Sequence, residues 1–294
     1  MKLFLSLALL AASTAVAGAA PIEAVASFSI LGDMVQVVGG DRVHVTTIVG
    51  PNADTHVYEP KPSDAAAVAK AQIFFVNGLG FEGWMDRFVQ STGYTGPLII
   101  ASNGVKSHTM VDDGATVTDP HAWQSLSNGI LYVENISKGL CAVDTDGCAT
   151  YQANAKKYEA QLSALDAEVK AQIATVPEGK RKVITTHDAF LYFGEEYGVT
   201  FLAPVGISTD AEPSAAGVAK LITQIKVEGV SALFIENMSD GRLIQQIASE
   251  TGVKMGGELY ADALSEPNEG APTYLDMFKH NVALLIPAMA RKQA

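Results

Sequence analysis

The chain has 294 residues, of which 48% are hydrophobic and 18% are charged. It is long enough for two domains with their own cores and too apolar to be a disordered chain. Its 20 Lys and Arg residues against 32 Asp and Glu residues give a formal net charge of −12. An acidic chain repels a phosphate backbone, so the charge argues against nucleic acid as a partner.

Residues 1–19 have the pattern of a secretory signal peptide. Lys2 supplies a positive start, about ten apolar residues follow it, and small residues around Ala17 and Ala19 provide a cleavage site. We therefore expect a periplasmic protein. An uncleaved anchor is the alternative, but the run is shorter than the roughly 20 residues that cross a bilayer. No Cys follows the run, so we expect no lipid attachment through a cysteine.

Residues 20–145 alternate short β-rich runs with helical stretches. Strands are predicted over four ranges, 24–30, 43–49, 73–77 and 98–101. This alternation is typical of βα units built around a parallel sheet. We therefore predict an N-terminal α/β lobe.

The segment 146–178 is predicted to be a linking helix. Between residues 150 and 176 one apolar residue recurs at each helical turn, giving the stripe Tyr151, Ala155, Tyr158, Leu162, Leu165, Val169 and Ile173. A helix of 27 residues is about 40 Å long, which is longer than one small domain is wide. We therefore predict a long rigid spine that joins two lobes.

The βα alternation starts again in residues 179–294, which we predict to be a C-terminal α/β lobe. Its expected strands are 183–186, 200–205, 232–235 and 255–260. Pro213 suits the first turn of a helix that runs to Glu228, and a final helix is expected over 271–292, bent at Pro287. The predicted fold class is α/β, with two parallel sheets and a cleft between the lobes.

The only cysteines, Cys141 and Cys148, lie close together near the start of the predicted spine. An oxidising compartment favours a disulfide between them. Zinc binding by this pair would need further soft ligands nearby, and no His is close in sequence. We therefore predict the disulfide.

Ligands bind parallel sheets in the crevice at the carboxyl ends of the strands. His56 follows the strand 43–49, His187 ends the strand 183–186, Asp262 follows the strand 255–260, and His121 stands in the motif DPHAWQS. Two of these residues come from each lobe, so all four can point into one cleft. Any one histidine alone would be read as a hydrogen-bonded residue at a strand end, but four matched places argue against that alternative. The other histidines, His44, His108 and His280, are assigned to structure or solvent.

Three imidazoles and one carboxylate are ligands that tetrahedral Zn²⁺ takes. Four protein ligands close a site, whereas hydrolytic zinc sites usually supply three and leave a position for water. The zinc-hydrolase motif HExxH is also missing. The pattern therefore favours a protein that binds the metal for transport and has no enzymatic activity. A secreted metallohydrolase and a metal-stabilised adhesin are the alternatives.

Three acidic residues are candidates to accept the second ring N–H of a ligating histidine. Glu236 ends a predicted strand, Asp188 is next to His187, and Asp119 is two residues before His121. Each could instead be a ligand or a surface acid. Trp123 and Tyr260 are expected to wall the site against water.

Five motifs carry a resemblance to a known family. GPNADTHVYEPKPSD, VNGLGFEGW, DPHAWQS, TTHDAFLYFGEEYG and LYADALSEP, in this order, resemble the motifs of the zinc and manganese solute-binding proteins of ABC importers, the cluster A-I family. The resemblance covers essentially the whole mature chain. It implies two lobes with a rigid linking helix, a metal between the lobes, and delivery to an ABC permease at the inner membrane. It also places His56, His121, His187 and Asp262 on ligand positions of the family.

The resemblance further indicates which metal is carried. Manganese carriers of the family tend to have a carboxylate at the position of His187, and an added imidazole favours Zn²⁺ over the harder Mn²⁺. We expect zinc, with manganese as the alternative, and a monomeric protein. Many zinc carriers have a long His-rich acidic loop before DPH, whereas residues 106–119 here contain one histidine, His108, and three acidic residues, Asp112, Asp113 and Asp119. We expect an ordinary solvated loop; recruitment of metal or contact with a periplasmic metal-donor protein is the alternative.

Overall fold

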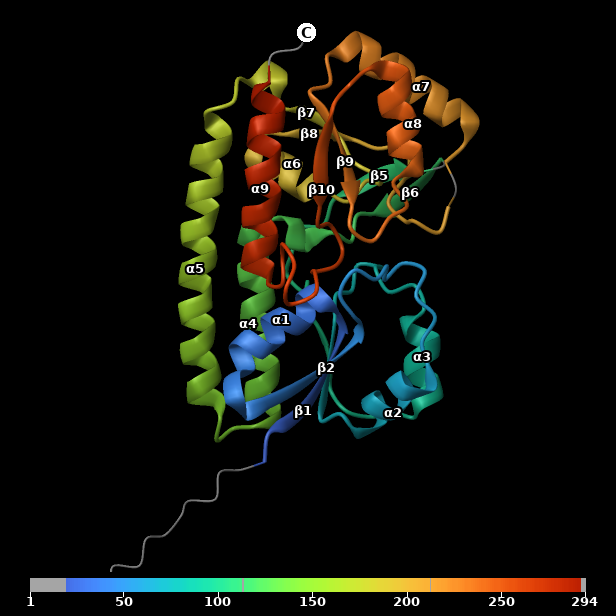
Figure 1. Cartoon of the computed structure of the whole chain (residues 1–294). Coiled ribbons are helices and arrows are strands. Elements are labelled where there is room, and N and C mark those ends of the chain that lie inside the picture. Colours follow the sequence, from blue (N-terminus) through green and yellow to red (C-terminus); the bar gives the residue numbers. More distant parts are fainter. Residues whose placement is uncertain (1–19, 113, 212, 292–294) are drawn as a thin grey trace, which may run out of the picture.

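The computed structural model describes residues 20–112, 114–211 and 213–291. The predicted signal peptide, residues 1–19, lies outside the described residues. Two α/β lobes lie one above the other, and long helices run along one side of both (Figure 1). The overall class is therefore the predicted one.

The N-terminal lobe contains a sheet of four parallel strands in the order β2-β1-β3-β4. The strands are β1 (Ile22–Phe28), β2 (Val43–Val49), β3 (Ile73–Val76) and β4 (Leu98–Ile100), and the helices are α1 (Ser29–Gly39), α2 (Pro62–Lys70) and α3 (Met85–Thr92). The first strand ends two residues earlier than predicted, because Ser29 and Ile30 begin α1. Both residues are buried, and a short apolar run fits the strand and helix periods equally well.

The C-terminal lobe repeats this plan with the order β10-β9-β7-β8, again with all strands parallel. Its strands are β7 (Lys182–Ile184), β8 (Thr200–Leu202), β9 (Ala232–Glu236) and β10 (Met255–Leu259), and its helices are α6 (Leu191–Tyr197), α7 (Ala215–Glu228) and α8 (Arg242–Thr251). Pro213 is not in the first turn of α7, contrary to the prediction. Ser214 caps this helix, because its hydroxyl accepts the Gly217 N–H at 3.0 Å.

The long helix α5 (Cys148–Ala174) lies inside the predicted linking segment and runs without interruption. Its buried residues are the seven of the predicted stripe. It packs against α4 (Leu126–Val143) and α1, and at its other end against α6 and α9 (Tyr274–Ala290). The main hydrophobic core runs from the first lobe past α5 into the second, so most of the core is shared between the lobes. A smaller cluster between β7, β9, α7 and α8 belongs to the C-terminal lobe alone.

The disulfide between Cys141 and Cys148 is present and joins the end of α4 to the start of α5. It therefore fixes the turn between the two longest helices of the side layer. Across the described residues, no helix combines the length and apolar character that a membrane span requires.

The segment 106–119 differs from the solvated loop that we expected. It contains an antiparallel hairpin of β5 (Thr109–Asp112) and β6 (Ala115–Thr118), whose turn includes Gly114 at a φ of 81°. An Asp-Gly pair between two short segments that contain Val and Thr is a hairpin signal, which the sequence analysis missed. Asp113 lies outside the described residues.

Candidate metal centre

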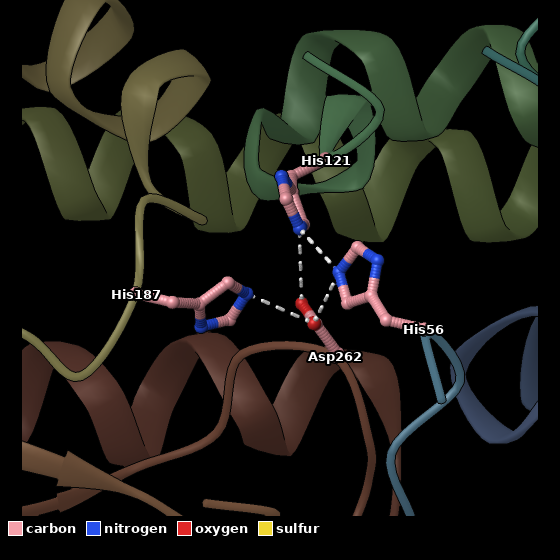
Figure 2. Close-up of side chains that lie close together, drawn as sticks. All are labelled: His56, His121, His187 and Asp262. Atoms are coloured by element: carbon pink, nitrogen blue, oxygen red, sulfur yellow. Dashed lines mark hydrogen bonds and ion pairs between the residues drawn. The ribbon is translucent and has the colours of Figure 1, made fainter. Parts of the chain in front are cut away.

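The four predicted side chains come from separate loops and point toward one another between the lobes (Figure 2). His56 lies in the loop after β2, His187 follows β7, and Asp262 follows β10, so these three are near the carboxyl ends of parallel strands. His121 differs, because it follows the hairpin strand β6 and precedes the short 3-10 helix Ala122–Gln124. The antiparallel hairpin, and not the parallel sheet, delivers His121 to the cleft.

The distances between the four groups match a small metal ion. The Asp262 carboxylate lies 3.1 Å from His187 Nε2, 3.3 Å from His56 Nε2 and 3.6 Å from His121 Nε2. The Nε2 atoms of His56 and His121 are 3.3 Å apart, and all four ligand atoms lie within 4.8 Å of one another. Bonds of about 2.0–2.2 Å to a tetrahedral ion place its ligand atoms roughly 3.3–3.6 Å apart.

The site is buried, and several of its polar atoms have no hydrogen-bond partner among the described residues. The side chains of His121, His187 and Asp262 are fully buried, and that of His56 is 4% exposed. Both Asp262 oxygens and His187 Nε2 are buried without a hydrogen bond from any described residue. Buried polar atoms are normally paired, so this donor set fits a cation at its centre.

Two carboxylates orient the histidine rings. Asp119 accepts the backbone N–H of His121 at 2.9 Å and contacts ring Nδ1 at 2.7 Å. Glu236 accepts the backbone N–H of His187 at 3.0 Å and also contacts its ring Nδ1. A hydrogen bond at Nδ1 leaves Nε2 as the metal-facing atom. Asp188 has a different setting, because it lines a separate cavity of about 390 Å³ beside Phe190 and Phe201.

Carboxylates in and around the site raise the pKa values of two of its histidines. Burial lowers the pKa of His121, but Asp262 and Asp119 outweigh it and raise that pKa to about 9. Burial likewise lowers the pKa of His187, and Glu236 and Asp262 raise it well above the usual value. Burial raises the pKa of Asp262, yet His121 and His187 bring it well below the usual value. A divalent cation would replace two imidazolium protons charge for charge.

Aromatic and amide side chains surround the site and hold one of its loops in place. Trp123 Nε1 and Gln124 Nε2 both donate to the carbonyl of Ala261, at 2.9 and 2.8 Å, and so hold the loop that presents Asp262. Phe81 lies edge-on to the His56 ring, with 4.9 Å between ring centroids. Sequence reasoning missed Phe81 and Gln124, although Gln124 stands in the DPHAWQS motif itself.

Tyr260, which we expected to wall the site, is buried against a different histidine. Its ring lies 4.9 Å from the His280 ring. His280 also contacts the Glu258 carbonyl at 2.9 Å, while His44 pairs with Glu23 at 2.9 Å. His108 pairs with Glu195 at 3.2 Å. These three histidines therefore have structural partners outside the metal centre.

Known proteins share both the sequence pattern and the fold. Residues 24–288 match the family described as zinc-uptake complex component A, periplasmic (ZnuA). The chain belongs to the ZnuA family. It is 34% identical to the manganese-binding lipoprotein MntA of Halalkalibacterium halodurans over 92% of this chain and 89% of that protein. It is 30% identical to the metal ABC transporter substrate-binding lipoprotein SsaB of Streptococcus sanguinis, with 98% of each chain covered.

Solved structures agree with this ZnuA-family assignment. The periplasmic zinc-binding protein TroA of Treponema pallidum superposes with a TM-score of 0.86 at 26% identity, covering 92% of this chain and 100% of that one. A Mn-bound periplasmic metal-binding protein of Candidatus Liberibacter asiaticus gives a TM-score of 0.82 at 30% identity, over 90% of this chain and 98% of that one. The ZnuA-family chain is thus a substrate-binding protein of a metal ABC importer and not an enzyme.

Proposed function

We propose that this protein captures Zn²⁺ in the periplasm through His56, His121, His187 and Asp262 and delivers it to its ABC permease. The observation that carries the proposal is the buried set of three imidazole nitrogens and one carboxylate whose ligand atoms lie within 4.8 Å of one another. Imidazole suits zinc, whereas carboxylate and water suit manganese. His187 is the decisive ligand, because a carboxylate in its place would give a harder donor set.

Manganese is the second candidate, because some of the relatives are named for it. MntA is named as manganese-binding, and the Liberibacter protein has been solved with Mn bound, whereas TroA is named as zinc-binding. A further relative, MtsA of Streptococcus pyogenes, is named for iron. The same fold therefore serves several divalent metals, and the ligand chemistry must decide among them.

Competition titrations with Zn²⁺ and Mn²⁺ against a chromophoric chelator test the proposal. We expect one Zn²⁺ per chain, bound about a hundredfold or more tightly than Mn²⁺, as the order of divalent affinities predicts. His187→Asp should reduce the ratio of Zn²⁺ affinity to Mn²⁺ affinity, because it replaces an imidazole by a carboxylate. His280→Ala, which removes a histidine outside the centre, should leave the ratio unchanged. Tighter binding of Mn²⁺ by the unaltered chain would decide for the second candidate.

We also propose that the mature protein is free in the periplasm, although MntA and SsaB are named lipoproteins. The two cysteines of the sequence are joined to each other in the Cys141–Cys148 disulfide, which leaves neither for a lipid. Phase partition of the expressed protein in Triton X-114 tests this. We expect recovery from the aqueous phase, and recovery from the detergent phase would contradict the free form.

A further inference from the structure

The carboxylate of Asp54 lies between the two lobes and has a separate partner in each. Its Oδ1 accepts the backbone N–H of His56 at 2.9 Å, within the loop after β2. Its Oδ2 accepts the hydroxyl of Thr209 at 2.7 Å, from the segment after β8 in the C-terminal lobe. A single side chain therefore joins the backbone of a candidate ligand to the opposite lobe.

The segment 207–210 lies between two cavities that each reach a candidate ligand. A cavity of about 490 Å³ is lined by Asp54, His187 and Thr209. A second cavity of about 450 Å³ is lined by His56, Ile207 and Ser208. Residues of this segment therefore form part of the wall of both cavities.

His56 is held differently from the other two histidines. Asp119 and Glu236 each contact ring Nδ1 of their histidine as well as its backbone N–H, whereas Asp54 contacts His56 through the backbone N–H. His56 is also the candidate ligand whose side chain is not fully buried. A ligand fixed through its loop is released when that loop moves, so a contact that holds the loop also holds the ligand.

We propose that Asp54 is a positioning residue that ties the His56 loop to Thr209 and thereby slows release of the bound metal. The inference rests on the proposed function, since it takes the four-residue centre as the metal site. A hydroxyl that donates to a carboxylate forms a charge-assisted hydrogen bond, which is stronger than a neutral one. Opening the lobes at this point must break that bond before His56 can move away.

A second set of contacts joins the same loop to the C-terminal lobe. Asn52 donates to Glu269 at 2.9 Å and accepts from Asn237 at 2.8 Å. Its backbone N–H donates to the Leu264 carbonyl at 2.9 Å. Because these contacts remain when the Asp54 tie is removed, we expect faster release and not complete loss of binding.

The experiment measures zinc release from the full mature chain by stopped flow, with excess EDTA trapping the metal. Thr209→Val removes the hydroxyl with little change of volume and should raise the release rate about tenfold, the effect of one hydrogen bond to a charged group. Ser208→Ala is the matched control, because its hydroxyl donates to Asp210 at 2.7 Å within the same segment. It should stay within about twofold of the unaltered chain.

Asp54→Ala removes the acceptor of the same hydrogen bond, and it keeps the proposal testable if Thr209→Val folds poorly. It should raise the rate at least as much as Thr209→Val, and adding Thr209→Val to it should change the rate less than about twofold. This coupling is a result that general loosening of the structure would not give. Unchanged release in Thr209→Val, or rates that multiply in the double variant, would overturn the proposal. Failure of the unaltered chain to bind Zn²⁺ would instead overturn the proposed function.

Discussion

The protonation of the metal-free site makes zinc binding a proton-releasing step, and the number of protons is predictable. His121 has a pKa raised to about 9, and the pKa of His187 is raised well above the usual value. Both rings therefore carry a proton at pH 7. Asp262, whose pKa is lowered well below the usual value, carries none. We expect two protons from His121 and His187 to leave for each Zn²⁺ bound.

The free-energy cost of deprotonating His121 follows from the difference between its pKa and the pH of the assay. A group two pH units below its pKa holds its proton in about 99% of molecules, so removing it costs about 2.7 kcal/mol, or a factor of about 100 in affinity. The metal binds the deprotonated ring, so affinity is lost as the pH falls. With two such rings, zinc affinity should rise about a hundredfold per pH unit between pH 6 and pH 8.

Calorimetric titrations in two buffers of different ionisation enthalpy give the number of protons released, and chelator competition gives the affinity at each pH. Asp119→Asn removes a carboxylate that raises the pKa of His121, so it should release fewer protons per Zn²⁺. Glu23→Gln is the matched control, because Glu23 pairs with the exposed His44. A proton count near zero, with an affinity that is flat from pH 6 to pH 8, would refute the assigned protonation.

Three further outcomes can be checked with single substitutions. His187→Ala should weaken zinc by about a hundredfold or more in chelator competition, whereas His44→Ala should have no effect. Leu162→Ala, at a fully buried position of α5, should lower the free energy of unfolding in urea by about 2–5 kcal/mol. Val227 is 80% exposed, so an equal loss of unfolding free energy in Val227→Ala would contradict the packing of α5. Cys148→Ser should cost about 2.5 kcal/mol in the same assay, the entropy of opening so short a loop.

The elements that follow a regular period were predictable because the signal is local. The seven buried positions of α5 recur with the helical repeat, and the strand Val43–Val49 has the predicted bounds. The disulfide was predictable from compartment chemistry. His56, His187 and Asp262 could be found because residues just after parallel strands share one edge of a sheet.

Other features depended on contacts that have no local signal. The hairpin of β5 and β6 was missed, and with it the route by which His121 reaches the cleft. Asp119 and Asp188 looked equivalent in sequence, yet Asp119 contacts a site histidine while Asp188 lines another cavity. The backbone direction of each loop decides between them, and a single sequence does not show it.

By itself the sequence determined the fold class, the spine helix and the residue types of the centre, because periodicity and side-chain chemistry are properties of short segments. Only the tertiary structure decided the distances among the four groups, the charges that surround them and the tie between Asp54 and Thr209. These depend on residues far apart in the chain. Their positions are set by how the two lobes pack against α5 and against each other.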